Sequence, residues 1–331
     1  ANLISNLIAL WACEGLRQRQ GFIVLRSLEK VIMKKGLGKT LRLVLPQWQG
    51  GDQPTYHLGA RVLAAILPEA TGPVEKVAVP PAKEEEREEE DGILSRSALL
   101  DNLDKAFAAI DKHKPDSIVT VGGDCLVDLA PIAYLNEKYG EDLAVLWIDA
   151  HPDIMSPNEY NHAHAHVLAM LMGEGDKDFV DQVPLKLKPE QVLYVGLNEP
   201  SSFESGFIQE KGLAALSPED LADSPDPVID WLKERNAKYI AVHFDLDVLS
   251  ASLYDFLYFR NPNVPESAFD GIAQGKMQLP QISKILKAAN AQAPIVGLAI
   301  TEFLPWNLVE LSNTLSSLPL IGENVSKGST N

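Results

Sequence analysis

The residues that decide the fold are Leu143-Ala144-Val145-Leu146-Trp147-Ile148-Asp149-Ala150-His151-Pro152-Asp153. The first six are apolar throughout, as expected for a strand that is buried on both faces of a parallel sheet. The run then ends in Asp149, His151 and Asp153, which are residue types that bind metal ions. The stretch therefore predicts a buried strand followed by a functional loop, because ligand sites gather at the carboxyl ends of such strands.

Similar apolar runs recur along the chain and alternate with segments that carry apolar residues at helical spacing. This alternation predicts an α/β fold, a three-layer α-β-α sandwich with a mostly parallel sheet. The expected strands are 41–45, 74–79, 117–121, 143–149, 191–195, 238–244 and 294–300. The expected helices are 97–112, 126–138, 167–172, 226–234 and 280–289.

The first 38 residues lack this alternation, which begins near Thr40. We expect residues 1–38 to be an N-terminal extension outside the core, with Met33 as a candidate internal start. Residues 39–325 are expected to form a single α/β domain. A chain of 331 residues is long enough for one such domain with a sizeable core.

Composition limits the kinds of partner. The formal net charge of −17 argues against binding to nucleic acid or to an anionic membrane surface, and it is compatible with a cationic substrate. No apolar stretch approaches the ~20 residues of a membrane span. The two cysteines, Cys13 and Cys125, form no disulfide framework. We therefore expect a cytoplasmic protein that has neither a nucleic acid nor a membrane as its partner.

Three other expected strands also end in polar residues. They are followed by Gly122-Gly123-Asp124-Cys125, Asp245-Leu246-Asp247 and Thr301-Glu302. A lone Asp-x-Asp is more often a loop cap or an ion-paired group. Several such clusters at the carboxyl ends of strands favour a metal site instead.

Extended-chain geometry predicts how these side chains meet. Alternate side chains of an extended chain share a face, so Asp149, His151 and Asp153 should point one way, and Asp245 and Asp247 likewise. Four ionised carboxylates in one crevice would raise one another's pKa values, and cations remove that repulsion. Oxygen ligands with an imidazole suit Mn²⁺ above all, with Zn²⁺, Fe²⁺ or Co²⁺ also possible. This many carboxylates indicates two divalent metal ions.

The order of the motifs resembles the ureohydrolase family of arginase, agmatinase and formimidoylglutamase. The resemblance runs from about Leu41 to Pro305 and rests on Gly122-Gly123-Asp124, Asp149-Ala150-His151-Pro152-Asp153, His243-Phe244-Asp245-Leu246-Asp247 and a late Glu302. It implies an arginase-like domain and a homo-oligomer. It also implies a binuclear metal-dependent hydrolase that cleaves a C–N bond of a small cationic guanidino or amidino substrate by a metal-bridging hydroxide.

The resemblance gives each matching residue an implied role. Asp149 and Asp245 match the carboxylates that bridge or approach both metals. Asp153 matches a ligand of the first metal and would take up the proton from the attacking water. His151 and Asp247 match ligands of the second metal.

Two further residues match catalytic groups of the family. Glu302 matches the acid that pairs with the substrate guanidinium, and His164 matches a proton-shuttling histidine. His162 and His166 alternate with His164, and the sequence leaves open which of the three is functional. The loop 47–52 is expected to border the pocket, with Trp48 as a candidate cover for an apolar part of the substrate.

Cys125 stands where the family has a histidine. Two interpretations stay open: a neutral thiol that leaves the first metal weakly held, or a thiolate ligand that shifts the preference from Mn²⁺ toward Zn²⁺, Fe²⁺ or Co²⁺. Residues 154–160 also depart from the polar stretch that arginases carry, so arginase-like, agmatinase-like and hydroxyarginine-hydrolysing activities are all compatible with the sequence. It is also compatible with a non-catalytic or single-metal binding protein and with a deacetylase-like metal hydrolase.

Overall fold

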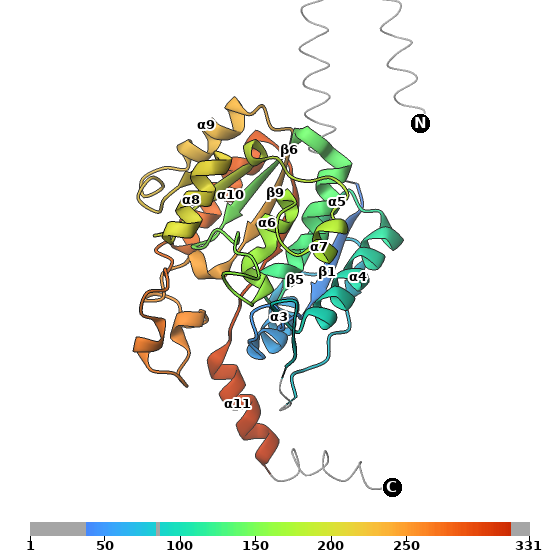
Figure 1. Cartoon of the computed structure of the whole chain (residues 1–331), viewed down its shortest axis with the longest axis vertical. Helices are drawn as coiled ribbons and strands as arrows, with labels where there is room; N and C mark the ends of the chain where they lie inside the picture. The colour runs from blue at the N-terminus through green and yellow to red at the C-terminus, as the bar shows by residue number, and fades with distance from the viewer. Residues whose placement is uncertain (1–37, 84–86, 319–331) are drawn as a thin grey trace, which may run out of the picture. The chain divides into compact units, whose positions relative to one another are not determined.

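The computed structural model describes residues 38–83 and 87–318 (Figure 1). Its centre is an eight-stranded sheet in the order β2-β1-β5-β10-β9-β6-β7-β8, and every pairing in this sheet is parallel. The strands are β1 (Thr40–Leu45), β2 (Val74–Lys76), β5 (Ser117–Gly122), β6 (Leu143–Ile148), β7 (Val192–Val195), β8 (Ala214–Leu216), β9 (Tyr239–Phe244) and β10 (Ile295–Ile300). The predicted α/β class with a mostly parallel sheet is confirmed. The extension expected at residues 1–38, with Met33, lies outside the described residues apart from Gly38.

Alternate residues of β6 face two different cores, as a strand buried on both faces requires. Val145 and Trp147 pack in a cluster with α4 (Arg96–His113), α5 (Leu129–Tyr139) and α6 (Val167–Met172). Leu146 and Ile148 pack in another with α9 (Asp226–Glu234) and α10 (Leu279–Gln292). The sheet therefore lies between two helical layers, as the sequence predicts (Figure 1).

Helix α3 (Thr55–Ile66) covers the sheet on the same face as α9 and α10. Its Leu63 packs against Val44 of β1 and Val121 of β5. Those two residues are register partners, and the same cross-strand row continues through Ile300 of β10. Ile300 also packs beside the α9–α10 cluster, so the three helices share one layer.

Several elements differ from the sequence-based expectation. The strand expected over 74–79 ends at Lys76, and the helix expected over 126–138 begins as a 3₁₀ turn, η1 (Cys125–Asp128), before α5. The sequence pattern did not predict β8 or four of the helices. These helices are α3, α7 (Lys177–Asp181), α8 (Ser202–Lys211) and α11 (Trp306–Ser317). A short antiparallel pair, β3 (Glu89–Glu90) and β4 (Ile93–Leu94), lies outside the main sheet.

The four strands that end in metal-ligand residue types are neighbours in the sheet, in the order β5-β10-β9-β6. From β6 the chain moves outward through β7 and β8 to one edge, whereas from β9, the neighbour of β6, it moves the opposite way to β10. This reversal is the switch point at which ligands bind in open parallel sheets. The topology thus brings all four carboxyl ends to the place where a site is expected.

Each helix within residues 38–83 and 87–318 is too short or too polar to cross a lipid bilayer.

Candidate metal centre

The first part of the centre is the Gly-Gly-Asp turn after β5. The Asp124 carboxylate is fully buried, and it accepts hydrogen bonds from Gln47 Nε2 at 2.8 Å and from the backbone N–H of Gly50 at 2.8 Å. Burial raises the pKa of Asp124 to about 6, while these hydrogen bonds oppose the rise. Asp124 therefore holds the loop after β1 against the end of β5.

Gly123 permits this close approach of two backbones. A Cβ atom at Gly123 would lie 1.6 Å from the carbonyl oxygen of Gln47, a separation that backbone atoms cannot tolerate. The requirement is for space, because the backbone of Gly123 does not have a positive φ. Close packing, rather than contact with a ligand, thus explains the second glycine of the Gly-Gly-Asp motif.

We predict that Gly123→Ala destabilises the protein by about 3 kcal/mol or more, because the turn and the loop after β1 must separate. Gly206→Ala is the matched control. Its added Cβ meets nothing within 4 Å, and Gly206 lies inside α8, where alanine is favoured by up to ~1 kcal/mol. Chemical unfolding of both variants measures the difference, and equal stabilities would contradict the packing account.

Asp149 and Asp153 do not project from an extended segment, so the predicted geometry is wrong here. The chain turns at once after β6: Asp149 Oδ1 accepts from the backbone N–H of His151 at 2.7 Å, and Asp153 has a φ of +52°. Asp149 Oδ2 accepts from Trp147 Nε1 at 3.2 Å. Asp149 and Asp153 are nevertheless brought together in one group of donors.

A similar turn follows β9. Asp245 Oδ1 accepts from the backbone N–H of Asp247 at 2.7 Å, where the 3₁₀ turn η5 (Leu246–Val248) begins. Asp247 Oδ2 lies 2.9 Å from Nδ1 of His151, which joins the end of β9 to the loop after β6. Turn-forming hydrogen bonds, not strand alternation, therefore bring these side chains together.

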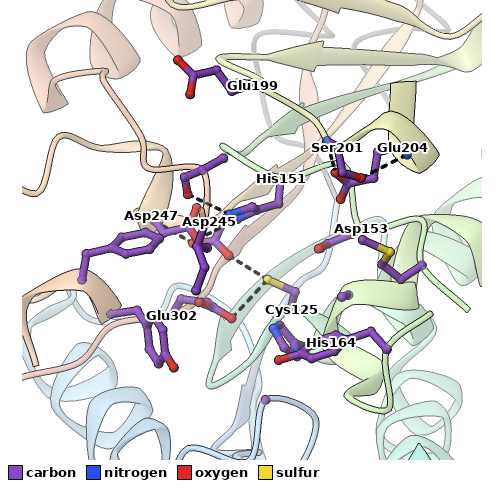
Figure 2. A pocket seen from close by; sticks show the side chains of 18 of the residues that line it. Cys125, His151, Asp153, His164, Glu199, Ser201, Glu204, Asp245, Asp247 and Glu302 are labelled. Carbon is purple, nitrogen blue, oxygen red and sulfur yellow. Dashed lines mark hydrogen bonds and ion pairs between the residues drawn. The ribbon is translucent and has the colours of Figure 1, made fainter. Parts of the chain in front are cut away.

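Cys125 occupies the start of η1 and is 1% exposed. Its Sγ donates to Asp245 Oδ2 at 2.8 Å and lies 3.7 Å from Glu302 Oε1 (Figure 2). Burial raises the pKa of the thiol well above its usual value, and the charges of Asp245, Asp153 and Glu302 raise it further. Without a cation at this place the side chain is a neutral thiol.

Three groups of donor atoms each lie within 4.8 Å of one another. They are Cys125–Asp149–Asp153–His243, Cys125–Asp245–Glu302 and Asp149–His151–Asp247. Three buried atoms here have no hydrogen-bond partner among the described residues, namely Asp153 Oδ2, Asp247 Oδ1 and His243 Nε2. Carboxylate, imidazole and sulfur atoms that converge, with two of the carboxylate oxygens and the imidazole nitrogen left unpaired, are a donor set that fits divalent cations.

The electrostatics of the cluster point the same way. Burial raises the pKa values of Asp149, Asp153, Asp245 and Glu302, and the neighbouring carboxylates raise them further. Burial also raises the pKa of Asp247, but the charge and hydrogen bond of His151 outweigh it and lower that pKa overall. These groups together place far more negative charge in a buried space than one imidazole can balance, which a bound cation would relieve.

Much of this cluster lines a cavity of about 390 Å³, namely Cys125, His151, Asp153, Asp245, Asp247 and Glu302. Its lining includes six carboxylates, which are Asp153, Glu199, Glu204, Asp245, Asp247 and Glu302 (Figure 2). Aromatic and apolar side chains form the walls, chiefly Tyr56, Met155, Tyr160, Tyr258 and Phe259. Within the described part of the chain, no Lys or Arg lines this cavity. The cavity is therefore suited to a small cation.

Glu302 follows β10 with a φ of +61°, and its backbone N–H donates to the carbonyl of Gly123 at 2.8 Å. Tyr56, a buried residue of α3, lies beside the Glu302 carboxylate, and its hydroxyl lowers the pKa of Glu302 against the rise that burial causes. The pKa of Tyr56 is raised well above 10.0, first by burial and then by Glu302. This pairing fixes the Glu302 carboxylate at the cavity wall.

The three alternating histidines have different surroundings. Only His164 lines the cavity, and its Nδ1 lies 2.9 Å from the carbonyl of Gly50. His166 is buried against the carbonyl of Tyr160, and His162 stacks on the ring of Tyr160. Burial lowers the pKa of His164 to about 3 and that of His166 to about 4. The geometry thus favours His164 among the three.

A model of the arginase family matches residues 74–255, more than half of the 331 residues. The chain belongs to the arginase family. The matching segment includes the Asp149–Asp153 and Asp245–Asp247 motifs, while Glu302 lies beyond it.

The arginase-family chain is 25% identical to the arginase of Staphylococcus aureus over 171 residues, covering 49% of this chain and 56% of that protein. It thus spans about half the length of the curated relatives it matches. Among solved structures, it resembles arginase from Bacillus caldovelox with a TM-score of 0.63 and 18% identity, over 81% of this chain and 91% of the other. Formimidoylglutamase from Bacillus subtilis gives 0.54 and 13%, over 82% and 81%. The structural matches support the arginase-like fold.

Three features of this arginase-family site were not predicted from sequence. Tyr56, Asp128 and His243 all make contacts between distant elements. No local motif marks Tyr56 or Asp128, and His243 stands in the motif of residues 243–247 but was given no role there. For Trp48 the expectation is wrong, because its ring is buried in the core and its Nε1 donates to the carbonyl of Pro80. The loop 47–52 does border the cavity, through Gly51.

Proposed function

We propose that this protein is a binuclear metal-dependent hydrolase that cleaves a C–N bond of a small guanidino or amidino cation. The observation that carries the proposal is the acidic cavity whose floor holds converging, unpaired metal-ligand atoms. Membership in the arginase family adds support. Two divalent ions, when bound, would polarise the substrate and lower the pKa of the attacking water.

The ligand assignment follows the donor groups. Cys125, Asp149 and Asp153 would hold the first ion, and Asp149, His151 and Asp247 the second. Asp245 would serve both, because its Oδ2 faces Cys125 and its Oδ1 lies on the Asp247 side. Mn²⁺ suits the oxygen-rich second position, while a Cys125 thiolate favours Zn²⁺, Fe²⁺ or Co²⁺ at the first.

The chain's own groups would position the substrate. Glu302 can accept two parallel hydrogen bonds from a planar guanidinium, and the hydroxyl of Tyr56 keeps that carboxylate in place. The rings of Tyr160, Tyr258 and Phe259 line the cavity and can contact the face of a flat cation. Glu302 and these rings would thus hold the trigonal carbon in one orientation toward the floor of the cavity.

Proton transfer would use two residues. Asp153 Oδ2, which has no partner among the described side and main chains, would accept the proton of the attacking water and deliver it to the leaving amine. A C–O bond forms, the C–N bond breaks, and the products are an amine and urea or a related amide. His164 donates from Nδ1 to Gly50, so its Nε2 is free to exchange protons between the cavity and solvent.

The test of this function is hydrolysis by the full chain, loaded with Mn²⁺ or Zn²⁺, of arginine, agmatine, N-hydroxyarginine and formimidoylglutamate. We expect Glu302→Gln to lower kcat/KM for the accepted substrate by about 10²–10³-fold, because a buried charge pair with the substrate is lost. Metal content should stay at two ions per chain. Glu199→Gln is the control, since Glu199 lies at the exposed rim.

The metal content also separates this hydrolase from its rivals. Two bound ions without hydrolysis of any substrate in the panel would favour a non-catalytic binding protein. A single bound ion would favour a deacetylase-like site. Loss of an ion in Glu302→Gln would show that Glu302 is a ligand, as its place beside Cys125 and Asp245 also permits.

A further inference from the structure

His243 is a buried imidazole beneath the metal centre, and the hydrolytic mechanism above gives it no role. It lies on β9, two residues before Asp245, and its side chain is fully buried. Its ring stacks on Trp147 of β6, with the ring centroids 3.9 Å apart and an interplanar angle of 14°. The stacking restricts the ring to one plane, so its nitrogen atoms point in fixed directions.

One ring nitrogen has a partner and the other does not. His243 Nδ1 lies 3.2 Å from Oδ2 of Asp128, which is itself buried in η1. As a carboxylate, Asp128 can only accept, so Nδ1 carries the hydrogen and Nε2 presents a lone pair. Nε2 has no hydrogen-bond partner in the described part of the chain and lies 3.8 Å from Asp149 Oδ2. A buried lone pair without a partner is unfavourable unless something binds it.

The unpaired nitrogen belongs to the first donor group, together with Cys125, Asp149 and Asp153. All the donor atoms in this group lie within 4.8 Å of one another. Neighbouring ligands of a four- or five-coordinate ion are separated by roughly 3–4 Å at usual metal–ligand distances. The group therefore needs to contract by roughly 1 Å to surround one cation.

We propose that His243 is an imidazole ligand of the first metal ion, supplied from β9. It compensates for Cys125, which stands after β5 where the family resemblance places a histidine. Asp128, His243 and the ion then form a carboxylate–histidine–metal series, in which the carboxylate fixes the tautomer and orients the ring. This inference rests on the proposed two-ion site.

The donor set has a consequence for the choice of ion. One sulfur, one nitrogen and the carboxylates of Asp149 and Asp153, with Asp245 shared between the two ions, form a donor set of the kind that Zn²⁺ and Co²⁺ accept. The second group, Asp149–His151–Asp247, has no sulfur donor. The two positions thus differ in ligand type, and the first should prefer Zn²⁺ or Co²⁺ over Mn²⁺.

The experiment is a Co²⁺ titration of the metal-free full chain, with metal content measured after dialysis and visible absorption recorded during binding. The unmodified protein should bind two ions, with a Co–thiolate charge-transfer band and an intense d–d spectrum typical of four- or five-coordinate Co²⁺ from the first position. His243→Phe keeps the ring stacked on Trp147 but removes both nitrogens. We expect at least about 100-fold weaker binding at one position, loss of that intense d–d spectrum, and retention of the other ion.

Two further variants make the result specific. Asp128→Asn keeps His243 but changes the group that fixes its tautomer, so affinity at the same position should fall about 10–100-fold. This variant carries the test if His243→Phe does not fold. His166→Phe is the matched control, because His166 is another fully buried imidazole, bonded to Tyr160 and absent from every donor group. It should bind both ions as the unmodified protein does.

The results separate this inference from the proposed function. If the unmodified protein binds no Co²⁺, both fail. If it binds two ions but a folded His243→Phe and Asp128→Asn both bind them with unchanged affinity and spectrum, only the assignment of His243 is overturned. Weaker binding in both variants, with none in His166→Phe, supports it.

Discussion

Asp245→Asn is expected to abolish tight binding of the metal pair and to lower hydrolysis by at least about 10³-fold. Asp245 is 1% exposed and reaches both proposed ion positions through its two oxygens. The substitution keeps the size of the side chain but replaces an anionic ligand by a neutral amide. An ion that polarises substrate contributes several kcal/mol to the reaction, so its loss is severe.

Metal content by elemental analysis and the rate of amine release measure this effect. Asp176→Asn is the control, because it removes a buried carboxylate charge that pairs with Arg96 instead of facing the cavity. The control should lose some stability but keep both ions. If the Asp245→Asn protein retained two ions and more than about a tenth of the activity, the metal centre would have to lie elsewhere in the protein.

The metal-free protein is expected to lose stability as pH rises from about 6.5 to 8.5, whereas the metal-loaded protein is not. Folding raises the pKa values of Asp153, Asp245, Glu302 and His151. A group whose pKa is higher in the folded state binds more protons when folded, so its contribution is complete at low pH and lost as pH rises. The stabilising contribution of the carboxylates begins to fall near pH 4, and that of His151 begins to fall near pH 6.5.

The pH window avoids groups that act in the opposite direction. The pKa values of His164 and His166 fall to about 3 and about 4 on folding, so their effect ends once the unfolded histidines are neutral, near pH 6.5. Asp247, whose pKa is lowered, is already ionised throughout the window. Asp124, with a pKa of about 6, has largely finished titrating.

Thermal unfolding with EDTA and with saturating Zn²⁺ or Mn²⁺ provides the measurement. Two ions present at about 1,000 times their dissociation constants add roughly 8 kcal/mol, which corresponds to a Tm difference of more than about 10 °C at pH 8. The difference should shrink toward pH 6.5, where protons replace the cations. A metal-free protein whose Tm is constant or rises over this range would contradict the buried-carboxylate account.

The sequence predicted best those elements whose pattern is local and strong. The strands β5, β6 and β9 are apolar nearly throughout, and each is followed by a polar motif, so their identity and their common edge could be inferred. The edge strand β8 has only three residues, all Ala or Leu, which carry no β-specific signal. Helix α8 has no continuous apolar face in its sequence, because Ser205 and Gly206 interrupt the helical spacing of its apolar residues, so its pattern did not predict a helix.

For the candidate site, the sequence placed Asp149, Asp153 and Asp245 at the ends of neighbouring strands. Their side chains approach Cys125 through turns that an extended-chain argument cannot represent. The environment of Cys125 depends on Asp245, which lies 120 residues away, and no local pattern encodes that distance. The expectation for Trp48 was wrong because a loop tryptophan can turn inward as readily as toward a cavity, and its bond to Pro80 settles the direction.

The convergence of four separate strand ends also fixes when a cation can enter during folding. Cys125 and Glu302 are 177 residues apart and meet only after β5, β10, β9 and β6 have paired in order. A nascent chain therefore offers no complete set of ligands, and the cation cannot act as a nucleus around which the sheet forms. Contacts made after the folding transition state leave the folding rate unchanged and slow unfolding. A cation bound at this site would therefore prolong the lifetime of the native state without changing the rate at which that state forms.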